Sequence, residues 1–183
     1  MPKVISGKLK GRTIKGYDID GTRPTMDRVK ESVFGMIQDY LKESIVLDLF
    51  AGSGNLGIEA LSNGAKKIYF NDINKKCTKV IQDNLREFNV LENSIVINMN
   101  YQEALNNFCE KNIKFDIVFL DPPYNNLIIN QILTLLVKNN LLNKNALVVC
   151  ELVKKEDFNN NQLILWKERK YGEKYVLIYK NNL

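Results

Sequence analysis

Short apolar runs alternate with amphipathic stretches between residues 45 and 151, and this alternation constrains the fold more than any other feature of the chain. The apolar runs predict strands, and the stretches between them carry hydrophobic residues at helical spacing. Strands separated in this way by helices form a parallel sheet that is covered on both faces. The predicted strands are 45–50, 67–71, 94–98, 115–120 and 145–151, and the predicted helices are 55–63, 74–89, 101–110 and 126–139.

The two ends of the chain depart from this pattern. Residues 162–167 and 174–180 predict two strands joined without a helix, which favours an antiparallel hairpin at one sheet edge. Near the N-terminus, residues 3–16 predict a short hairpin and residues 26–41 a helix. We therefore expect an α/β, Rossmann-like fold with a seven-stranded, mostly parallel sheet. A small N-terminal hairpin–helix extension, residues 1–41, would precede the sheet domain, residues 42–183.

Residue usage excludes several classes of chemistry. The chain has no histidine, which rules out imidazole-based acid–base and nucleophilic mechanisms. Its cysteines, Cys77, Cys109 and Cys150, are far apart and odd in number, so we expect neither a metal site nor a disulfide framework. No apolar run is long enough for a membrane span, and the N-terminal residues do not have the pattern of a signal peptide. The expectation is a reduced, cytoplasmic protein without membrane contact, and a monomer is the simplest state.

The formal net charge of +5 is concentrated near the N-terminus. Residues 1–30 contain eight Lys or Arg and three Asp, whereas the rest of the chain has equal numbers of basic and acidic residues. Such asymmetry is typical of a segment that binds a polyanion. A solvated, lysine-rich terminus would show the same charge, so composition alone leaves both interpretations open.

A glycine-rich turn with an acidic residue before it follows the first predicted strand. Gly52 and Gly54 would let the backbone approach a ligand closely, and Gly57 would let the next helix pack tightly on the sheet. Asp48 separates this turn from a dinucleotide site, because a carboxylate there would repel a pyrophosphate but can meet an ammonium group. The alternative is an ordinary tight turn in which Asp48 accepts hydrogen bonds from backbone N–H groups.

Polar residues also follow the second and third predicted strands. Asp72 comes about twenty residues after the glycines, where a carboxylate can bind both hydroxyls of a ribose, and Ile73 is available to pack on an adenine ring. Asn100 could bind an adenine edge. The alternative is that Asp72 or Asn74 caps a helix and that Asn100 forms a capping box with Glu103.

The tetrapeptide Asp121-Pro122-Pro123-Tyr124 ends the apolar run 115–120. Neither proline has an N–H group, so their carbonyls remain free to accept a hydrogen bond from a ligand. The carboxylate, the carbonyls and the aromatic ring together suit a flat base that carries an exocyclic amino group. With the glycine-rich turn, this corner points to transfer of a methyl group to nitrogen.

At this point the chain resembles the class I S-adenosylmethionine-dependent methyltransferases, and more closely the RsmD family, which methylates guanine N2 in 16S ribosomal RNA. The resembling segments cover nearly the whole chain. They are VISGKLKGRTIK, TRPTMDRVKESVFGMI, VLDLFAGSGNLGIEALSNGA, FDIVFLDPPY and RKYGEKYVLIYK.

The resemblance implies a role for each candidate residue. The methionine part of the cofactor would be held by Asp48, Ala51, Gly52, Ser53 and Gly54, the ribose by Asp72 and the adenine by Asn100, while Ile73, Tyr101 and Asp121 complete the predicted cofactor site. Asp121, Pro122, Pro123 and Tyr124 would surround the target amine, with the base flipped out of its stack. Phosphate contacts to 16S ribosomal RNA, within the small subunit or an assembly intermediate, are predicted for Lys8, Lys10, Arg12, Arg23 and Arg28.

Other functions stay open at this stage. Arg28 could pair with Glu31 instead of a phosphate. An N-methyltransferase of DNA adenine or cytosine would use the same proline corner, although no target-recognition domain is evident. A noncatalytic RNA-binding assembly factor would not need the intact Asp121 and glycines. A nicotinamide-dependent oxidoreductase would need a pyrophosphate site where Asp48 stands.

Overall fold

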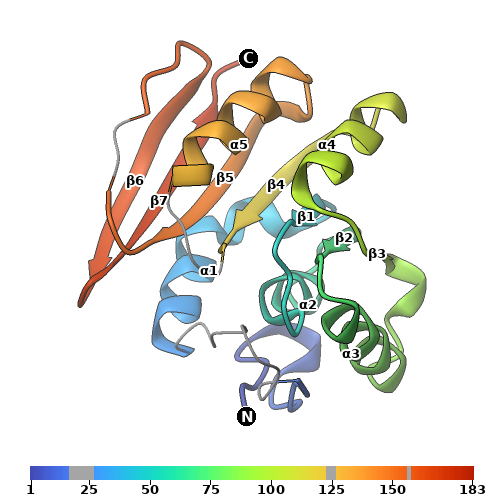
Figure 1. Ribbon diagram of the computed structural model, residues 1–183. Coiled ribbons are helices and arrows are strands. Elements are labelled where there is room, and N and C mark those ends of the chain that lie inside the picture. Colours follow the sequence, from blue (N-terminus) through green and yellow to red (C-terminus); the bar gives the residue numbers. More distant parts are fainter. Residues whose placement is uncertain (17–26, 123–126, 156–157) are drawn as a thin grey trace.

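A seven-stranded sheet forms the centre of the computed structural model, which describes residues 1–16, 27–122, 127–155 and 158–183 (Figure 1). The strand order is β3-β2-β1-β4-β5-β7-β6. Neighbouring strands from β3 to β5 pair in parallel, whereas β7 pairs antiparallel with both β5 and β6. The strands are β1 (Ile45–Asp48), β2 (Lys67–Asn71), β3 (Ser94–Ile97), β4 (Phe115–Leu120), β5 (Leu142–Leu152), β6 (Leu163–Tyr171) and β7 (Lys174–Asn181). The mostly parallel sheet with an antiparallel C-terminal hairpin is thus confirmed.

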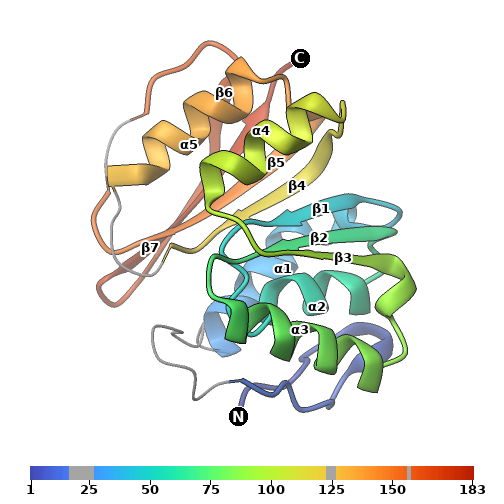
Figure 2. The ribbon, with the colours of Figure 1, turned by 45° about the vertical axis from the view of Figure 1, so that its right-hand side comes forward.

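Helices cover both faces of this sheet (Figure 2). They are α1 (Asp27–Leu41), α2 (Asn55–Ser62), α3 (Lys75–Glu87), α4 (Tyr101–Glu110) and α5 (Leu127–Lys138), with short 3-10 helices at Gly7–Leu9 and Leu91–Asn93. One buried cluster joins α1, α2 and α3 to one face, and a second joins α4 and α5 to the other. Among the described residues, no helix has the length and apolar character needed to cross a membrane.

The alternation of side chains along the strands explains why both faces are apolar. In β4, Ile117 and Phe119 belong to the cluster under α1 and α2, while Val118 and Leu120 belong to the cluster under α4 and α5. Successive residues of a strand point to opposite faces, so a strand buried on both sides must be apolar throughout. This is why continuous apolar runs were sufficient to locate the central strands.

The N-terminal segment forms a loose antiparallel hairpin with a 3-10 helix between its two arms. Among the described residues, the only bridge outside the named strands pairs Lys3 with Thr13. The first 3-10 helix lies between these two residues in the sequence. Val4, Leu9 and Ile14 are buried in the same cluster as residues of α1, α2 and α3, and the segment lies on the side of these helices that faces away from the sheet (Figure 2). Val4 donates its backbone N–H to the carbonyl of Arg12, and Ile14 donates to that of Pro2, both at 2.9 Å, so antiparallel pairing and side-chain burial together hold the segment.

A buried ion pair links this segment to the first two helices. Lys30 of α1 and Glu59 of α2 lie 3.0 Å apart, and both side chains are fully buried. Glu59 also accepts hydrogen bonds from the backbone N–H groups of Ile5 and Ser6, at 3.0 and 2.8 Å. Lys30 donates to the carbonyl of Lys3 at 2.7 Å. Because buried charges are costly unless they are paired and hydrogen-bonded, these contacts fix the N-terminal segment in one place.

Candidate cofactor and acceptor site

The polar residues singled out in the sequence lie at the carboxyl edge of the parallel strands. Asp48 is the last residue of β1, Asp72 follows β2, Asn100 follows β3 and Asp121 follows β4. Asp48 is in register with Phe119 of β4, so Asp121 lies two residues beyond the partner of Asp48. Open parallel sheets bind their ligands at this edge.

Asp48 is a buried carboxylate at the start of the glycine-rich turn. Asp48 is only 2% exposed, and its Oδ2 accepts a hydrogen bond from the backbone N–H of Gly57 at 3.0 Å. Burial raises the pKa of Asp48 to about 7, the Gly57 N–H opposes this rise, and the charge of Asp72 adds to it. The backbone contact foreseen for a purely structural role is therefore present, but it does not offset the cost of burial. A cation next to Asp48 would do so.

The turn itself requires glycine at two points. Gly54 is the N-cap residue of α2 and has a φ of 84°, a conformation that side chains with a Cβ rarely adopt. A Cβ on Gly57 would lie 2.2 Å from the ring of Phe70, so any larger residue would push α2 off the sheet. The role predicted for Gly57 in tight helix–sheet packing is supported by this approach.

Asp72 organises the same turn from the neighbouring strand. Its Oδ2 accepts the backbone N–H of Gly52 and its Oδ1 accepts that of Asn74, both at 2.8 Å. Asn74, whose side chain accepts the N–H of Lys76, is the N-cap residue of α3. Of the two residues proposed as a cap, Asn74 fills that position. Ile73, beside Asp72, is 74% exposed, which leaves a large apolar surface next to the carboxylate.

Asn71 connects three strand ends, a role that was not foreseen. Its buried amide nitrogen donates to the carbonyls of Leu49 and Met99, each at 3.1 Å, which ties the β1 turn to the loop after β3. A short polar side chain at the end of an apolar strand was the available signal. The side-chain oxygen has no hydrogen-bond partner among the described residues.

Asn100 and Tyr101 begin α4. Asn100 is the N-cap residue, and its Oδ1 accepts the N–H of Glu103 at 3.0 Å, so the capping alternative is confirmed. Tyr101 donates its hydroxyl to Gln131 of α5 at 3.0 Å, and its ring lies 6.0 Å from that of Phe50. Both residues lie at the sheet edge next to the turn; the contact of Asn100 to adenine and the place of Tyr101 in the cofactor site stay predictions.

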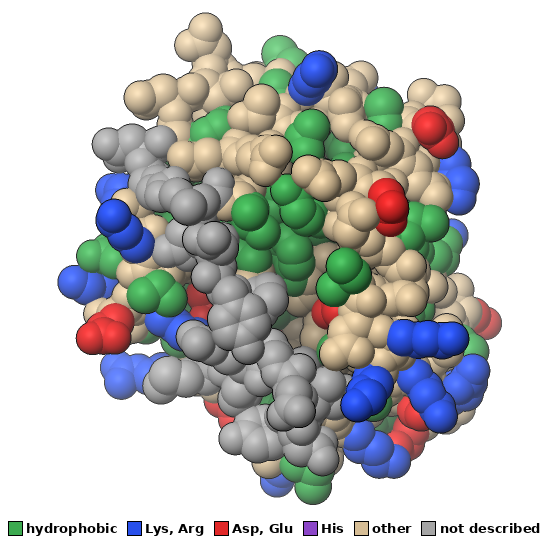
Figure 3. Space-filling model, in the orientation of Figure 1, with side chains coloured by type: hydrophobic (Ala, Val, Ile, Leu, Met, Phe, Trp, Pro, Cys, Tyr) green, Lys and Arg blue, Asp and Glu red, His purple; other side chains and the backbone are tan. Residues whose placement is uncertain are grey.

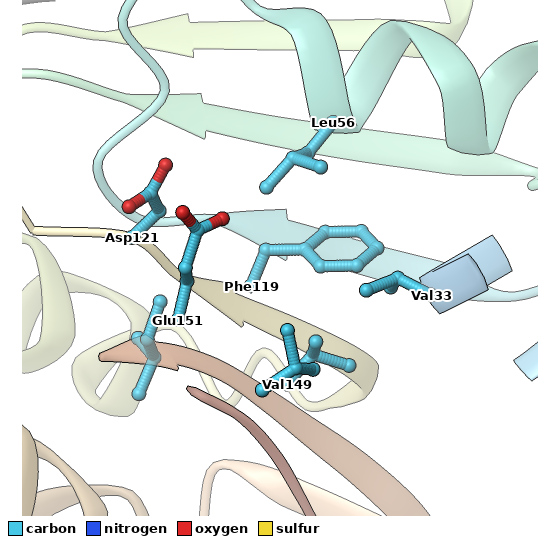
Figure 4. A pocket seen from close by; sticks show the side chains of 8 residues that line it. Val33, Leu56, Phe119, Asp121, Val149 and Glu151 are labelled. Atoms are coloured by element: carbon cyan, nitrogen blue, oxygen red, sulfur yellow. The ribbon is translucent and has the colours of Figure 1, made fainter. Parts of the chain in front are cut away.

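Asp121 lines a pocket at the carboxyl ends of β4 and β5 (Figure 4). Apolar side chains form most of the lining, and two carboxylates complete it. The pocket is lined by Val33, Leu56, Phe119, Leu120, Asp121, Val149, Glu151 and Val176. Pro122 follows Asp121 and is partly buried. Pro123 and Tyr124 lie outside the described residues, so their predicted contacts to a base stay predictions.

The predicted RNA-binding residues lie on the surface where they are described. Lys8, Lys10, Arg12 and Arg28 are exposed, whereas Arg23 lies outside the described residues. The guanidinium of Arg12 lies 5.7 Å from the centre of the Phe88 ring. Within the described part of the chain, Arg28 forms no ion pair with Glu31. Figure 3 shows that Lys and Arg side chains gather on this face over the region of α3, whose Lys75, Lys76 and Lys79 are exposed.

The sheet order, the glycine turn after β1 and the carboxylates at the strand ends define the Rossmann-like fold of the class I methyltransferases. Within this class, the family model of "Conserved hypothetical protein 95" matches residues 2–180. The chain belongs to this family, the RsmD family, as its sequence motifs predicted.

Known proteins of this kind are similar over nearly the full length. The ribosomal RNA small subunit methyltransferase D of Haemophilus influenzae is 37% identical over 181 residues, which cover 98% of this chain and 93% of that protein. A methylase structure from the same species is 35% identical, with a TM-score of 0.80 and coverage of 99% of this chain and 98% of that one. An RNA methyltransferase from Salinibacter ruber in complex with S-adenosyl-L-homocysteine shares the fold alone, at 19% identity, with a TM-score of 0.66 and coverage of 87% and 94%.

Two acidic residues with distinct roles were missed in the sequence. Glu59 follows the glycine turn on the buried side of α2, and Lys30 has the helical spacing of its buried neighbours Val33 and Ile37. A charge on an apolar helix face was thus the signal for the buried pair. Glu151 follows the apolar run of β5, in the same way that Asp121 follows the apolar run of β4. An acidic residue at the end of each run was the available signal that both line one pocket.

Proposed function

We propose that this protein transfers a methyl group from S-adenosylmethionine to the exocyclic N2 of a guanine in 16S ribosomal RNA. The observation that carries the proposal is the position of Asp121. It lines an apolar pocket at the carboxyl edge of the sheet, and Asp48 and Asp72 lie at the same edge. Family membership supports a ribosomal RNA methyltransferase, since a relative at 37% identity has that name. The guanine and its N2 atom are the part that rests on the chemistry of the pocket.

The residues at the edge fit S-adenosylmethionine. Asp48 is buried, and burial raises its pKa. An ammonium group from the methionine part of the cofactor would stabilise its ionised form. The turn of Ala51, Gly52, Ser53 and Gly54 would hold the rest of that part. Asp72 would bind the ribose, with the exposed Ile73 against the adenine and Asn100 and Tyr101 at its edge. The cofactor supplies an electrophilic methyl group on a sulfonium.

The acceptor side must make a poor nucleophile react. The lone pair of the guanine amino group is delocalised into the ring, so the nitrogen attacks a methyl group only when its geometry changes. Asp121 and the carbonyl of Pro122 would accept its two N–H bonds and direct the lone pair toward the methyl group. Asp121 would then take the proton that the nitrogen releases, and Tyr124 would stack on the flipped base.

The N-terminal segment would position the RNA. Lys8, Lys10, Arg12 and Arg28 are exposed cations that can neutralise phosphates without reading sequence, and Arg23 completes the predicted set. In this proposal residues 1–41 contact RNA, and residues 42–183 bind the cofactor and carry out the transfer. The substrate would be the small ribosomal subunit or an assembly intermediate, and the protein would act in the cytoplasm as a monomer.

The proposal is tested with tritiated S-adenosylmethionine and three acceptors: small ribosomal subunits from cells lacking this protein, naked ribosomal RNA, and duplex DNA. The expected product is N2-methylguanosine in 16S ribosomal RNA, identified after digestion to nucleosides. Asp121→Ala, which removes the acceptor for the amine, is the control expected to lack transfer. Label in DNA would assign the protein to the adenine or cytosine methyltransferases, and bound cofactor without transfer to any acceptor would favour a noncatalytic assembly factor.

A further inference from the structure

Glu151 lies beside Asp121 in the acceptor pocket. Strands β4 and β5 pair in parallel with Leu120 in register with Cys150, so the next residues of the two strands are neighbours. Asp121 and Glu151 both project to the side of the sheet that carries Phe119 and Val149, and both line the pocket (Figure 4). The proposed amine-binding carboxylate therefore has a second carboxylate next to it.

Glu151 is held in place from the other side by β7. Its side chain is 10% exposed and forms an ion pair with Lys174, which is 26% exposed. A carboxylate in apolar surroundings is costly without such a partner, and the pair leaves one side of Glu151 facing the pocket. Glu151 thus combines a largely buried side chain, a paired carboxylate and a place in the wall of the pocket that is proposed to receive the base.

The hydrogen-bonding edge of guanine matches two adjacent carboxylates. Guanine presents the N1–H donor directly beside its N2 amino group, and carboxylates accept hydrogen bonds but do not donate them. Adenine and cytosine present an acceptor nitrogen next to their amino groups, which would face a negative charge. A pocket with one carboxylate at the amine and a second beside it therefore selects guanine among the amino-bearing bases.

We propose that Glu151 is the specificity-determining residue of the acceptor pocket and accepts the N1–H of the target guanine while Asp121 binds its N2 amino group. This inference rests on the proposed function, because it assumes that the pocket receives guanine. The apolar lining from Val33, Leu56 and Phe119 excludes water around the base, which strengthens a hydrogen bond to a carboxylate.

The test uses 2-aminopurine, which keeps the amino group of guanine but has an acceptor nitrogen in place of N1–H. The target nucleotide is first located with wild-type protein, and 16S ribosomal RNA is then ligated with guanosine or 2-aminopurine at that position. Wild-type protein is expected to prefer guanosine by about 100-fold in kcat/KM, since a site built around a charged acceptor rejects an analogue without the donor.

The variant Glu151→Gln separates a direct contact from a structural role. A glutamine can accept from N1–H or donate to an acceptor nitrogen, so the preference for guanosine is expected to fall to a few-fold. The preference is the ratio of kcat/KM for the two RNAs, measured with one preparation of the variant. A reduced fraction of folded protein lowers both rates equally and leaves this ratio unchanged. The control Glu168→Gln removes another carboxylate, one on β6 that pairs with Lys155 at partly exposed positions, and it should keep the wild-type preference.

The outcomes distinguish this inference from the proposed function. Loss of the preference in Glu151→Gln alone supports the contact to N1–H. Equal rates for the two RNAs with wild-type protein, or an unchanged preference in Glu151→Gln, would overturn the role of Glu151 while guanine methylation stands. No transfer to guanosine by wild-type protein would instead refute the proposed function itself.

Discussion

Lys30 and Glu59 are 3.0 Å apart, and neither side chain is exposed. The pair joins α1 and α2, the helices that precede and follow β1 in the sequence. Lys30 also donates to Asn55 Oδ1 at 2.7 Å, at the first residue of α2. The helix that starts at the glycine turn is thereby connected to α1 and to the N-terminal segment. The position of the turn consequently depends on a buried charge pair behind it.

Replacement of Lys30 by methionine is expected to destabilise the protein by about 3–5 kcal/mol, because Glu59 would remain as a buried charge without a counterion. Urea unfolding measures this change. The control Lys155→Met breaks an ion pair whose side chains are 38% and 35% exposed, and it should cost at most about 1 kcal/mol. Equal effects of the two substitutions would show that burial of the Lys30–Glu59 pair does not matter.

The raised pKa of Asp48 predicts how stability changes with pH. An unfolded aspartate releases its proton near pH 4, whereas folded Asp48 keeps it up to about pH 7, so this group lowers the free energy of unfolding as pH rises through that interval. Relative to Asp48→Asn, the wild type should lose on the order of 3 kcal/mol between pH 5 and pH 8. Urea unfolding of both proteins at several pH values checks this, and a constant difference between them would contradict it.

The same carboxylate predicts a pH dependence of cofactor binding. An ammonium group beside Asp48 favours its ionised form, so binding should release a proton below pH 7, and affinity should rise with pH by up to tenfold per unit between pH 5 and pH 7. Calorimetric titration with S-adenosylmethionine in two buffers of different ionisation enthalpy counts the protons. The rise should be absent in Asp48→Asn, and its persistence there would place the titrating group elsewhere.

Asp121→Ala is expected to reduce turnover by at least about 100-fold while the affinity for S-adenosylmethionine changes far less, because the carboxylate acts on the acceptor amine. Single-turnover transfer and calorimetric binding give the two quantities. Asp116→Asn is the control on the same strand, since Asp116 accepts the N–H of Ile45 at 2.7 Å and the amide of Asn143 at 2.8 Å at the other end of β4. Full activity of Asp121→Ala would refute the assignment.

Charge reversal at Lys10 and Arg12 should weaken RNA binding and flatten its salt dependence, with the slope of log K against log salt reduced by about 2. Binding of labelled 16S ribosomal RNA at several salt concentrations measures the slope. A double reversal at Lys138 and Lys144 makes the same charge change on exposed residues near the amino end of β5 and should leave the slope unchanged. Equal slopes in all three proteins would remove the N-terminal segment from the interface.

The sequence was sufficient for the sheet and for the carboxylates that follow its strands, because apolar runs and the residues after them are local signals. It was insufficient where a residue's role depends on a distant partner. Lys30 carries a charge that favours the surface, and its burial is explained by Glu59, the carbonyl of Lys3 and Asn55 Oδ1. Glu151 stands at the end of a predicted strand, but its place in the pocket follows from the pairing of β5 with β4 and β7.

The N-terminal hairpin was predicted only in outline, for a related reason. Residues 2–4 and 11–14 do pair, but a weak period of two shows neither the 3-10 helix between them nor the burial of Val4, Leu9 and Ile14 against the helices. The capping of α4 by Asn100 was foreseen as an alternative because a cap is read from residues three apart. Sequence patterns predict a contact well when its two residues lie within one helical turn of each other.

The acceptor pocket has one wall that is synthesised very late. Val176 lines it and Lys174 pairs with Glu151, and both belong to β7, which inserts between β5 and the edge strand β6. Chains emerge from the ribosome N-terminus first, so the glycine turn and its helices can form while β7 is still inside the exit tunnel. A growing chain thus acquires the glycine turn of the proposed cofactor site before the pocket of Asp121 and Glu151, and a nascent chain that stops short of β7 lacks one wall of that pocket.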